Sequence, residues 1–331
     1  MTAIAREMVA WGKRLFERRL VSGWGGNISC RLSDGDILIT GQHAPLGFLT
    51  ASDIVRLTSD GKARGKNRRA SSETPMHLAI YQGTDARAVI HAHPPMTLAY
   101  SFDHDRFDPL SFEEKFTVGT VAVITQETPT VTRPEALVES LLYQPIVIVK
   151  GHGTVAVGGD LKEAFLLTDL LEEAVRCHAF RAQAGSPRPQ TGVSANAARP
   201  QPSANHAYPL FSREHMHALV KSVKEDQQFR ADGSATGLTT SLTLHLRDSD
   251  AFWTVKFTAG EIAGIEQSAD GEFLISAEKR WWEAVFNNRM DPFFATLRGK
   301  LTLERGDLAK LAQWYKPFQR AFTLWQTIPV R

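Results

Sequence analysis

Two histidines separated by one residue are the feature of this sequence most able to do chemistry. His91 and His93 lie in the apolar run 86–93, which is typical of a buried strand, so both side chains should leave the same face. His152 stands between two glycines, where the backbone can approach a ligand closely. Three imidazoles with a fourth position left open are a common arrangement around catalytic zinc. From these residues alone, a metal site and ordinary polar surface both remain open.

A glutamate and two serines mark a second candidate position. Glu73 lies in the first turn of a helix predicted over 72–82, where the helix dipole favours a carboxylate. Ser71 and Ser72 come just before it, beside backbone N–H groups that could bind a phosphate or another anion. Ser72 would equally serve as the N-cap of the helix, so capping is the alternative explanation for the serines.

The elements that must position these residues alternate between strand and helix. Strands are predicted at 26–32, 36–40, 86–93 and twice within 145–159, and helices near the amino terminus, at 72–82 and from 160 to about 181. Asp160 and Glu163 form the capping box that opens the last of these helices. Mixed elements on this scale predict an α/β sandwich over residues 1–182.

A change of composition divides the chain into two domains. Residues 183–207 hold four prolines and no acidic side chain, which predicts a flexible linker between a first domain at 1–182 and a second at 208–331. In the second domain, helices are predicted at 212–229, 278–288 and 307–320, and strands at 238–247, 252–258, 261–267 and 272–276. This pattern is typical of an α+β domain with a mostly antiparallel sheet.

Composition and charge exclude several classes of protein. The 331 residues carry 38 Lys+Arg against 36 Asp+Glu, a net charge of +2, without the basic excess that a nucleic-acid partner would require. No run approaches the roughly 18 apolar residues that cross a bilayer. Two cysteines cannot form a disulfide framework, and charges interrupt the amino terminus, so we expect a cytoplasmic protein without a secretory signal.

Four segments, in this order, resemble the class II aldolase/adducin family, especially its L-fuculose-phosphate aldolase branch. They are GGNIS (25–29), SSETPMHLAIY (71–81), AVIHAHPP (88–95) and GHGTVAVGGDLKEAF (151–165), and they span nearly all of residues 1–182. The resemblance implies a three-layer α/β/α fold and an oligomer, typically a tetramer, with active sites between subunits.

The resemblance also implies roles for individual residues. His91, His93 and His152 match the ligands of a zinc ion, although imidazoles also suit other divalent metals such as manganese or cobalt. Glu73 matches the catalytic glutamate of the family. The residues that would hold a substrate phosphate are Asn27, Thr40, Gly41, Ser71 and Ser72.

The implied activity is that of a lyase acting on a small carbohydrate. Cleaving a carbon–carbon bond beside a ketone leaves an enediolate, whose charge a divalent metal can stabilise while Glu73 moves a proton. Relatives with the same metal site also decarboxylate, epimerise or dehydrate sugar phosphates and sugar acids, so these reactions are the alternative. A non-catalytic adducin-like scaffold is a third possibility, but such relatives lack the metal ligands that are present here.

Three departures from the family pattern leave the substrate open. The family often has Thr-Pro-Ser/Thr-Gly after its second strand, whereas this chain has Thr-Gly-Gln-His at 40–43. No tyrosine stands in 108–124 to protonate a leaving aldehyde, and the predicted linker replaces the family's closing tail.

Residues 208–331 resemble the sterol carrier protein 2 (SCP2-like) domain. The features that carry this resemblance are WTVKFTAGEIAGIEQ (253–267), AEKRWWEAVF (277–286) and DPFFATLRGKLTLERGDLAKL (291–311). Such domains enclose a tunnel for hydrophobic ligands, which these aromatics could line: Trp281, Trp282, Phe286, Phe293, Phe294 and Trp314. A packed aromatic core is the alternative, so this domain could carry a hydrophobic ligand or serve as an assembly module.

Overall fold

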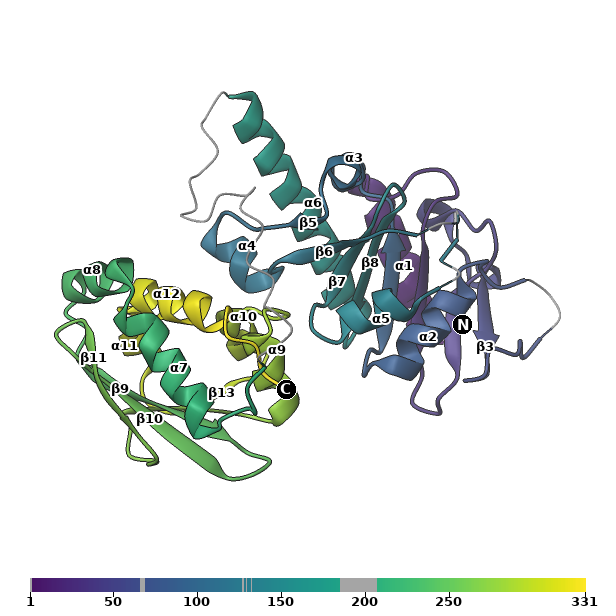
Figure 1. Ribbon diagram of the computed structural model, residues 1–331. Helices are drawn as coiled ribbons and strands as arrows, with labels where there is room; N and C mark the ends of the chain where they lie inside the picture. The colour runs from purple at the N-terminus through teal and green to yellow at the C-terminus, as the bar shows by residue number, and fades with distance from the viewer. Residues whose placement is uncertain (1, 66–68, 127, 129, 132, 185–206) are drawn as a thin grey trace. The chain divides into compact units, whose positions relative to one another are not determined.

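The strands of the first unit form one mixed β-sheet, and both faces of this sheet are buried. The computed structural model of the chain describes residues 2–65, 69–126, 128, 130–131, 133–184 and 207–331, in two units, Met1–Arg188 and Pro189–Arg331 (Figure 1). The strands within the described part are β1 (Asn27–Arg31), β2 (Ile37–Thr40), β3 (Ile54–Leu57), β4 (Ala88–Ala92), β5 (Arg106–Phe107), β6 (Val121–Ile124), β7 (Ile146–Val149) and β8 (Gly153–Gly158). Their order is β3-β2-β1-β4-β8-β7-β6-β5, with β6 and β7 parallel and the other neighbours antiparallel.

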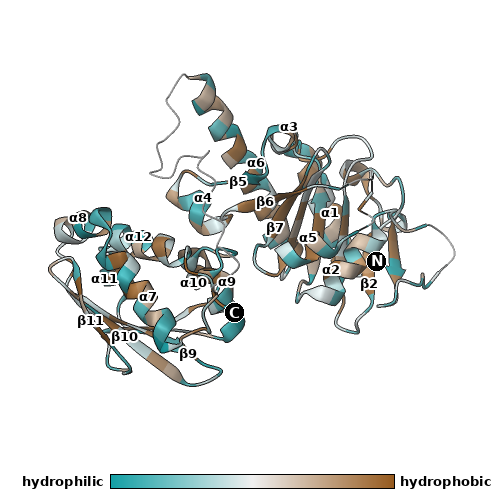
Figure 2. Cartoon of the chain, in the orientation of Figure 1, coloured by the Kyte–Doolittle hydropathy of each residue, from teal (hydrophilic) through white to brown (hydrophobic). Residues whose placement is uncertain are grey.

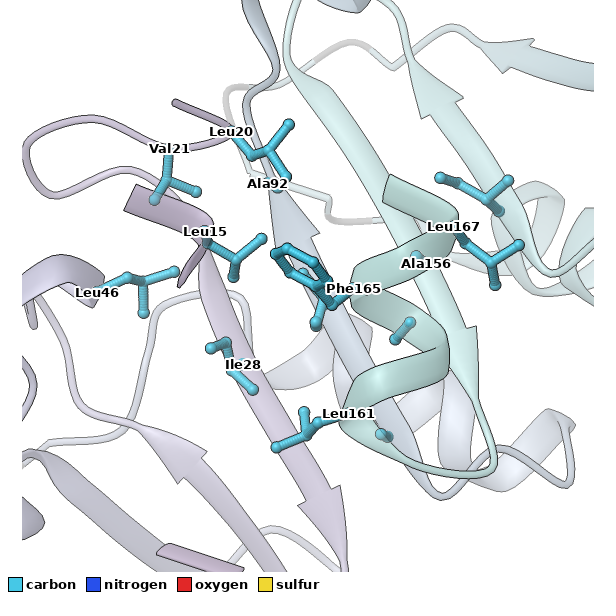
Figure 3. Close-up of a cluster of buried hydrophobic side chains, with 14 of the residues drawn as sticks. Leu15, Leu20, Val21, Ile28, Leu46, Ala92, Ala156, Leu161, Phe165 and Leu167 are labelled. Atoms are coloured by element: carbon cyan, nitrogen blue, oxygen red, sulfur yellow. The ribbon is translucent and has the colours of Figure 1, made fainter. Parts of the chain in front are cut away.

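Helices cover both faces of this sheet, which makes the three-layer α/β/α fold predicted for residues 1–182. The α-helices are α1 (Ala3–Glu17), α2 (Thr74–Gly83), α3 (Pro95–Asp103), α4 (Phe112–Thr117), α5 (Glu135–Leu141) and α6 (Leu161–Gln183), with short 3₁₀ turns at Leu46–Phe48 and Ala51–Asp53. Helices α1 and α6 pack on one face, where Leu15 and Phe165 meet Ile28 and Ala156 of the sheet (Figure 3). Helices α2 and α5 pack on the other face, and brown apolar strands lie between the two layers (Figure 2).

Strand alternation decides which side chains reach the candidate site. In β4, Ala88, Ile90 and Ala92 belong to the core under α1 and α6, whereas Val89 packs toward α2 and α5. His91 therefore leaves the sheet on the α2 side, as the predicted strand required. In β1, Ile28 lies in the core under α1 and α6, so its neighbours Asn27 and Ser29 also face α2.

The start of α2 differs from the sequence prediction. Ser72 is exposed and does not cap the helix; Glu73 is the N-cap residue, and its side chain makes no capping bond. The hydroxyl of Ser71 instead accepts a hydrogen bond from the backbone N–H of Glu73, and Pro75 occupies the first turn. The capping prediction at α6 holds for its first half, because the side chain of Asp160 accepts from the N–H of Glu163.

The second unit is an α+β structure, with helices gathered on one face of its sheet (Figure 1). Its described elements are α7 (Arg213–Lys224), α8 (Gln227–Ala235), β9 (Thr240–Leu246), β10 (Ala251–Thr258), β11 (Glu261–Glu266), β12 (Phe273–Ala277), α9 (Lys279–Phe286), α10 (Pro292–Leu297), β13 (Thr302–Arg305), α11 (Leu308–Ala312) and α12 (Tyr315–Trp325). The order β11-β10-β9-β12-β13 is antiparallel except for β9 and β12, which confirms a mostly antiparallel sheet.

Two long helices predicted in this unit are each divided. The predicted helix 212–229 ends at Lys224, and Asp226 starts a new helix by accepting from the N–H of Phe229. The predicted helix 307–320 is likewise two helices, α11 and α12, with Trp314 at the start of the second. Helix α10 and strand β13 were not predicted, although Asp291 caps α10 just before a proline, which is a typical start signal.

Two further predictions meet the structure only in part. The linker at 183–207 lies almost wholly outside the described residues, so its flexibility and its boundaries stay predictions. Of the helices in the described part of the chain, none combines the length and the apolar character that a membrane span requires.

Candidate metal centre and active site

The three predicted histidines meet at the end of β4. The Nε2 atom of His91 lies 2.9 Å from that of His93 and 3.3 Å from that of His152. His91 comes from inside β4, His93 from the residue after Ala92, and His152 from the turn between β7 and β8. Strands β4 and β8 are paired, with His91 opposite Val155, and this pairing brings the turn beside the two histidines.

This arrangement fits a divalent metal ion. Ligands held about 2.0–2.1 Å from a tetrahedral zinc ion lie about 3.3 Å from one another, close to the spacings seen here. Among the described residues, His91, His93 and His152 form a group able to hold one metal ion, with ligand atoms all within 4.8 Å. Three nitrogen lone pairs that converge in this way repel one another unless a proton or a cation lies between them.

Hydrogen bonds select the nitrogens that face the centre. The Nδ1 of His91 lies 2.9 Å from the carbonyl oxygen of Thr154 and can only donate to it, so the Nε2 of His91 keeps a lone pair. The Nδ1 of His152 lies 2.8 Å from the side-chain amide of Gln126. A metal on Nε2 requires a proton on Nδ1, and Gln126 would then present its amide oxygen to accept it.

Burial keeps these imidazoles neutral, which is the form that binds metals. Burial lowers the pKa of His91 well below its usual range, and the neighbouring His93 and His152 lower it further. Burial, together with His152, lowers the pKa of His93 to about 4, and burial lowers that of His152. At neutral pH the site therefore offers three uncharged ligands.

Two glycines leave room for the ring of His93. A Cβ atom on Gly25 would lie 2.8 Å from the Nδ1 of His93, and one on Gly153 would lie 2.7 Å from its Cδ2 and 2.2 Å from the carbonyl oxygen of Ala92. Neither contact can be relieved without moving the ligand or the strand. Glycine is therefore required on steric grounds at positions 25 and 153, which belong to two of the four matching segments.

Glu73 is a buried carboxyl group on the α2 side of the sheet. It is 6% exposed, and its Oε2 accepts a weak hydrogen bond of 3.4 Å from the N–H of Val131. Burial raises the pKa of Glu73, and the bond from Val131 opposes this only in part. Its carboxylate is not part of the three-histidine group. A carboxyl group whose pKa is raised gives and takes a proton closer to neutral pH than an ordinary carboxyl group does.

Asn27 is joined to helix α2 by a buried hydrogen-bond chain. Its Oδ1 contacts the Nε2 of His77, whose Nδ1 lies 2.6 Å from the hydroxyl of Ser29. The hydroxyl of Ser29 lies 2.7 Å from that of Tyr81. In the sheet, Asn27 is the antiparallel partner of His91, so the chain ends next to the three-histidine group.

The other predicted anion-binding residues are neighbours through the backbone. The N–H of Ser71 donates to the carbonyl of Thr40 at 3.0 Å, and Gly41 forms a bridge with Ala70. The hydroxyl of Thr40 is buried and accepts from the N–H of Ile28, so it supports β1. Ser72 is exposed beside them.

Sequence reasoning missed four residues around the site: Ser29, Tyr81, Gln126 and Thr154. Ser29 and Tyr81 carried a signal, because Ser29 shares a strand face with Asn27 and Tyr81 follows His77 by one helical turn. Gln126 and Thr154 carried none, since only the folded positions of the loop and of β8 bring them to the histidines.

Comparison with known proteins matches the first unit to one family. The model of the class II aldolase and adducin N-terminal domain matches residues 6–179. The chain is 34% identical over 173 residues to an L-fuculose phosphate aldolase of Methanococcus maripaludis, covering 51% of this chain and 93% of the relative. It is 32% identical to a methylthioribulose-1-phosphate dehydratase of Gluconobacter oxydans, over 54% and 92% of the two chains. It is also 32% identical to a 3-oxo-tetronate 4-phosphate decarboxylase of Haemophilus influenzae, over 53% and 88%.

Solved structures match each unit. The L-fuculose-1-phosphate aldolase of Thermus thermophilus is 31% identical with a TM-score of 0.51, over 56% of this chain and 97% of that one. A sterol carrier protein 2 is a structural neighbour at 24% identity and a TM-score of 0.33, over 36% of this chain and 98% of that one. Because the family model covers more than half of the 331 residues, the chain belongs to the class II aldolase and adducin N-terminal domain family.

Proposed function

We propose that this protein is a divalent-metal-dependent lyase that cleaves a phosphorylated hydroxy-ketone by retro-aldol chemistry. The observation that carries the proposal is the convergence of three neutral imidazoles, His91, His93 and His152. A buried carboxyl group, Glu73, lies on the same side of the sheet as His91. A zinc ion is the proposed metal, with manganese or cobalt as alternatives, since imidazole nitrogen suits all three. When bound, the ion would supply Lewis-acid stabilisation of the negative charge that develops on the substrate oxygens.

Glu73 is the proposed general acid/base. Its burial favours the protonated form, so the carboxyl group can take a proton from carbon or oxygen and return it without large energetic loss. Val131 holds the carboxylate through its backbone N–H, which restricts where the proton is delivered. A non-catalytic scaffold would have no use for a buried carboxyl group and three convergent, neutral histidines in one domain.

Asn27, Ser71 and Ser72, with the backbone around Thr40 and Gly41, form the proposed phosphate subsite. The three relatives described above are named for substrates that all carry phosphate, which supports a phosphorylated substrate here. The Ser71 hydroxyl already accepts from the N–H of Glu73, so it would offer its own hydrogen to the anion. The exposed Ser72 hydroxyl can turn toward a ligand.

Decarboxylation, epimerisation and dehydration are the alternative reactions on the same residues. The relatives include a decarboxylase and a dehydratase at 32% identity, nearly as similar as the aldolase at 34%. Like the retro-aldol reaction, decarboxylation and dehydration of such substrates develop negative charge next to a carbonyl group. We favour aldol cleavage because a solved structure at 31% identity is also that of an aldolase.

The test is a metal-reconstitution assay on the full chain. The purified protein is stripped by a chelator, reloaded with zinc, manganese or cobalt, and incubated with a panel of ketose phosphates and sugar acids. Metal-dependent release of dihydroxyacetone phosphate and an aldehyde is the expected result. Release of carbon dioxide or loss of water, without carbon–carbon cleavage into two carbonyl products, would replace the aldolase proposal by one of the alternatives. Absence of any bound metal would replace it by the scaffold.

For the second unit we propose a role as an assembly module for an oligomer of this chain. Five of the six aromatics that could have lined a tunnel are buried, and the ring of Phe286 contacts those of Trp282 and Trp325. This packing supports the core interpretation over a ligand tunnel. A hydrophobic ligand that co-purifies with the chain, found by extraction with organic solvent, would instead support the carrier. A monomeric chain in light scattering would also contradict the proposal.

A further inference from the structure

A buried chain of four polar side chains ends at the proposed phosphate subsite. It runs from the hydroxyl of Tyr81 to the hydroxyl of Ser29 at 2.7 Å, on to the Nδ1 of His77 at 2.6 Å, and from the Nε2 of His77 to the Oδ1 of Asn27. The four residues are between 0% and 6% exposed. The hydroxyls of Tyr81 and Ser29 make no further side-chain hydrogen bond among the described residues, so the chain is closed at its inner end.

Two arrangements of protons are possible in this chain. Burial lowers the pKa of His77 to about 3, so its ring is neutral and has one donor and one acceptor nitrogen. In the first arrangement, Tyr81 donates to Ser29, Ser29 donates to Nδ1 of His77, and Nε2 donates to Asn27. In the second, every bond is reversed, and the amide nitrogen of Asn27 must donate to His77.

Only the first arrangement pairs the two hydroxyl donors and the imidazole donor of the chain. In the second, the hydroxyl hydrogen of Tyr81 has no acceptor among the described residues, although the group is buried. The first arrangement fixes the tautomer of His77 with its proton on Nε2. It also fixes the amide of Asn27, with the oxygen toward His77 and the NH₂ group turned away from it.

We infer that Tyr81, Ser29 and His77 are positioning residues that hold the amide of Asn27 with its NH₂ group toward an anionic oxygen of the substrate. The inference rests on the proposed function, in which Asn27 contacts the substrate phosphate. Among the described residues, nothing accepts a hydrogen bond from this amide nitrogen, so its donors remain for a ligand. An amide turned the other way would present its oxygen and repel an anion.

The effect of losing the positioning residues follows from the populations of the two orientations of the Asn27 amide. If the amide of Asn27 turns over freely, the competent fraction falls from nearly all molecules to between a half and a tenth. The apparent dissociation constant of an anion then rises about two- to tenfold. Because the contact is the same before and during the reaction, KM rises by that factor and kcat stays unchanged.

The first measurement is the tautomer of His77, read by long-range ¹H–¹⁵N NMR on the zinc-loaded, ¹⁵N-histidine-labelled full chain. The signal is assigned by its loss in His77→Gln. We expect a proton on Nε2 alone in the natural sequence and a mixture of tautomers in Tyr81→Phe. A proton on Nδ1 in the natural sequence would overturn the inference, whatever the enzyme's reaction proves to be.

The second measurement is the binding of inorganic phosphate by the same zinc-loaded protein. Tyr81→Phe removes one hydroxyl and leaves the ring, and it should weaken phosphate binding about two- to tenfold while zinc content is unchanged. Asn27→Ala gives the full loss of phosphate affinity that the amide contributes. Adding Tyr81→Phe to this variant should weaken binding no further, because Tyr81 acts through Asn27. Tyr100→Phe is the matched control, since its hydroxyl bonds to Arg106 at the far edge of the sheet.

The outcomes separate the inference from the proposed function. The positioning role is wrong if Tyr81→Phe binds phosphate as tightly as the natural sequence does. It is also wrong if Tyr81→Phe weakens phosphate binding by the same factor whether Asn27 is present or replaced by Ala. If the natural sequence itself binds no phosphate, the proposed phosphate subsite is wrong, and the NMR measurement alone decides whether the chain of bonds orients Asn27.

Discussion

Each unit of this protein buries a histidine completely, and the two units treat it in opposite ways. In the first unit, both ring nitrogens of His77 are hydrogen-bonded to side chains, those of Ser29 and Asn27. In the second unit, His215 accepts from the N–H of Phe211 at 3.2 Å, but its Nε2 has no partner among the described residues. Its ring instead meets the ring of Phe286 edge to face, with centroids 4.9 Å apart.

The surroundings of His77 are typical of a binding site, whereas those of His215 are typical of a hydrophobic core. Buried polar groups in the first unit are paired in a definite order, which fixes side-chain orientation next to the histidine cluster. In the second unit, the buried imidazole meets the rings of Tyr208 and Phe286, and such aromatic rings stabilise the fold through packing and apolar burial. We therefore expect substitutions in the first unit to change ligand binding, and substitutions in the second to change stability.

His91→Ala should give the largest effect on this comparison. It removes the central one of the three proposed metal ligands, so the loss of metal affinity should exceed the about 10–100-fold that changes to supporting residues cause. Activity should be lost with the metal, as measured by elemental analysis and turnover. Tryptophan fluorescence should change little, because five of the seven tryptophans belong to the second unit. His217→Ala, an exposed histidine of α7, is the control, and metal retained in His91→Ala would contradict the site.

Glu73→Gln should lower kcat by about 10²–10⁴ and leave the metal bound. The amide fills the same space but cannot move a proton. In the natural sequence, burial raises the pKa of Glu73 above its ordinary value of 4.5, so the acid limb of the rate profile should lie above pH 4.5. That limb should disappear from any residual activity of the variant. An unchanged rate would remove Glu73 from the mechanism.

Much of the first unit's site could be predicted because local rules place its residues. Alternation along β4 puts His91 and His93 on one face, and the turn at 151–153 brings a third histidine between glycines. The chain from Asn27 to Tyr81 could not be predicted, because it depends on how α2 lies across β1, and that is decided by the packing of the whole layer. Gln126 follows β6 and meets His152 only through the pairing of β6 with β7.

The second unit also shows what could not be predicted from the sequence. Its strands β9 to β12 could be predicted from alternation, whereas β13 was not predicted. The helices at 212–229 and 307–320 were each predicted as one where the structure has two. The break at Asp226 occurs because its carboxylate caps α8 and also pairs with Arg320, a residue 94 positions away. Hydrophobic periodicity continues across such a break, so the pattern alone favours one helix.

His215 should make the second unit sensitive to acid. Burial lowers the pKa of His215 to about 4 from an ordinary 6.5, so the unfolded chain takes up a proton at a higher pH than the folded chain. Stability from this group is therefore full above pH 6.5 and is lost as pH falls toward 4, by about 3 kcal/mol in total. Urea unfolding followed by tryptophan fluorescence would measure it. His215→Gln should flatten the dependence, and His217→Gln, on the exposed face of the same helix, should not.

Gln126→Met should give the smallest of these effects and tests the comparison most closely. The thioether cannot accept from the Nδ1–H of His152 as the amide oxygen of Gln126 would in the metal-bound form, so metal affinity should fall about 10–100-fold in chelator competition, with the fold unchanged. Gln126→Glu restores an acceptor at the same position and should recover the affinity. Gln144 is the matched control, because it is a buried glutamine of the first unit whose amide oxygen has no hydrogen-bond partner among the described residues.

Gln144→Met should therefore alter stability alone. If both glutamine variants lost metal equally, the affinity would follow the general stability of the first unit rather than the orientation of His152. That result would contradict the expectation that substitutions in the first unit change ligand binding through the orientation of individual side chains. If only Gln126→Met loses metal and Gln126→Glu regains it, the supporting shell of the metal centre extends to the loop after β6.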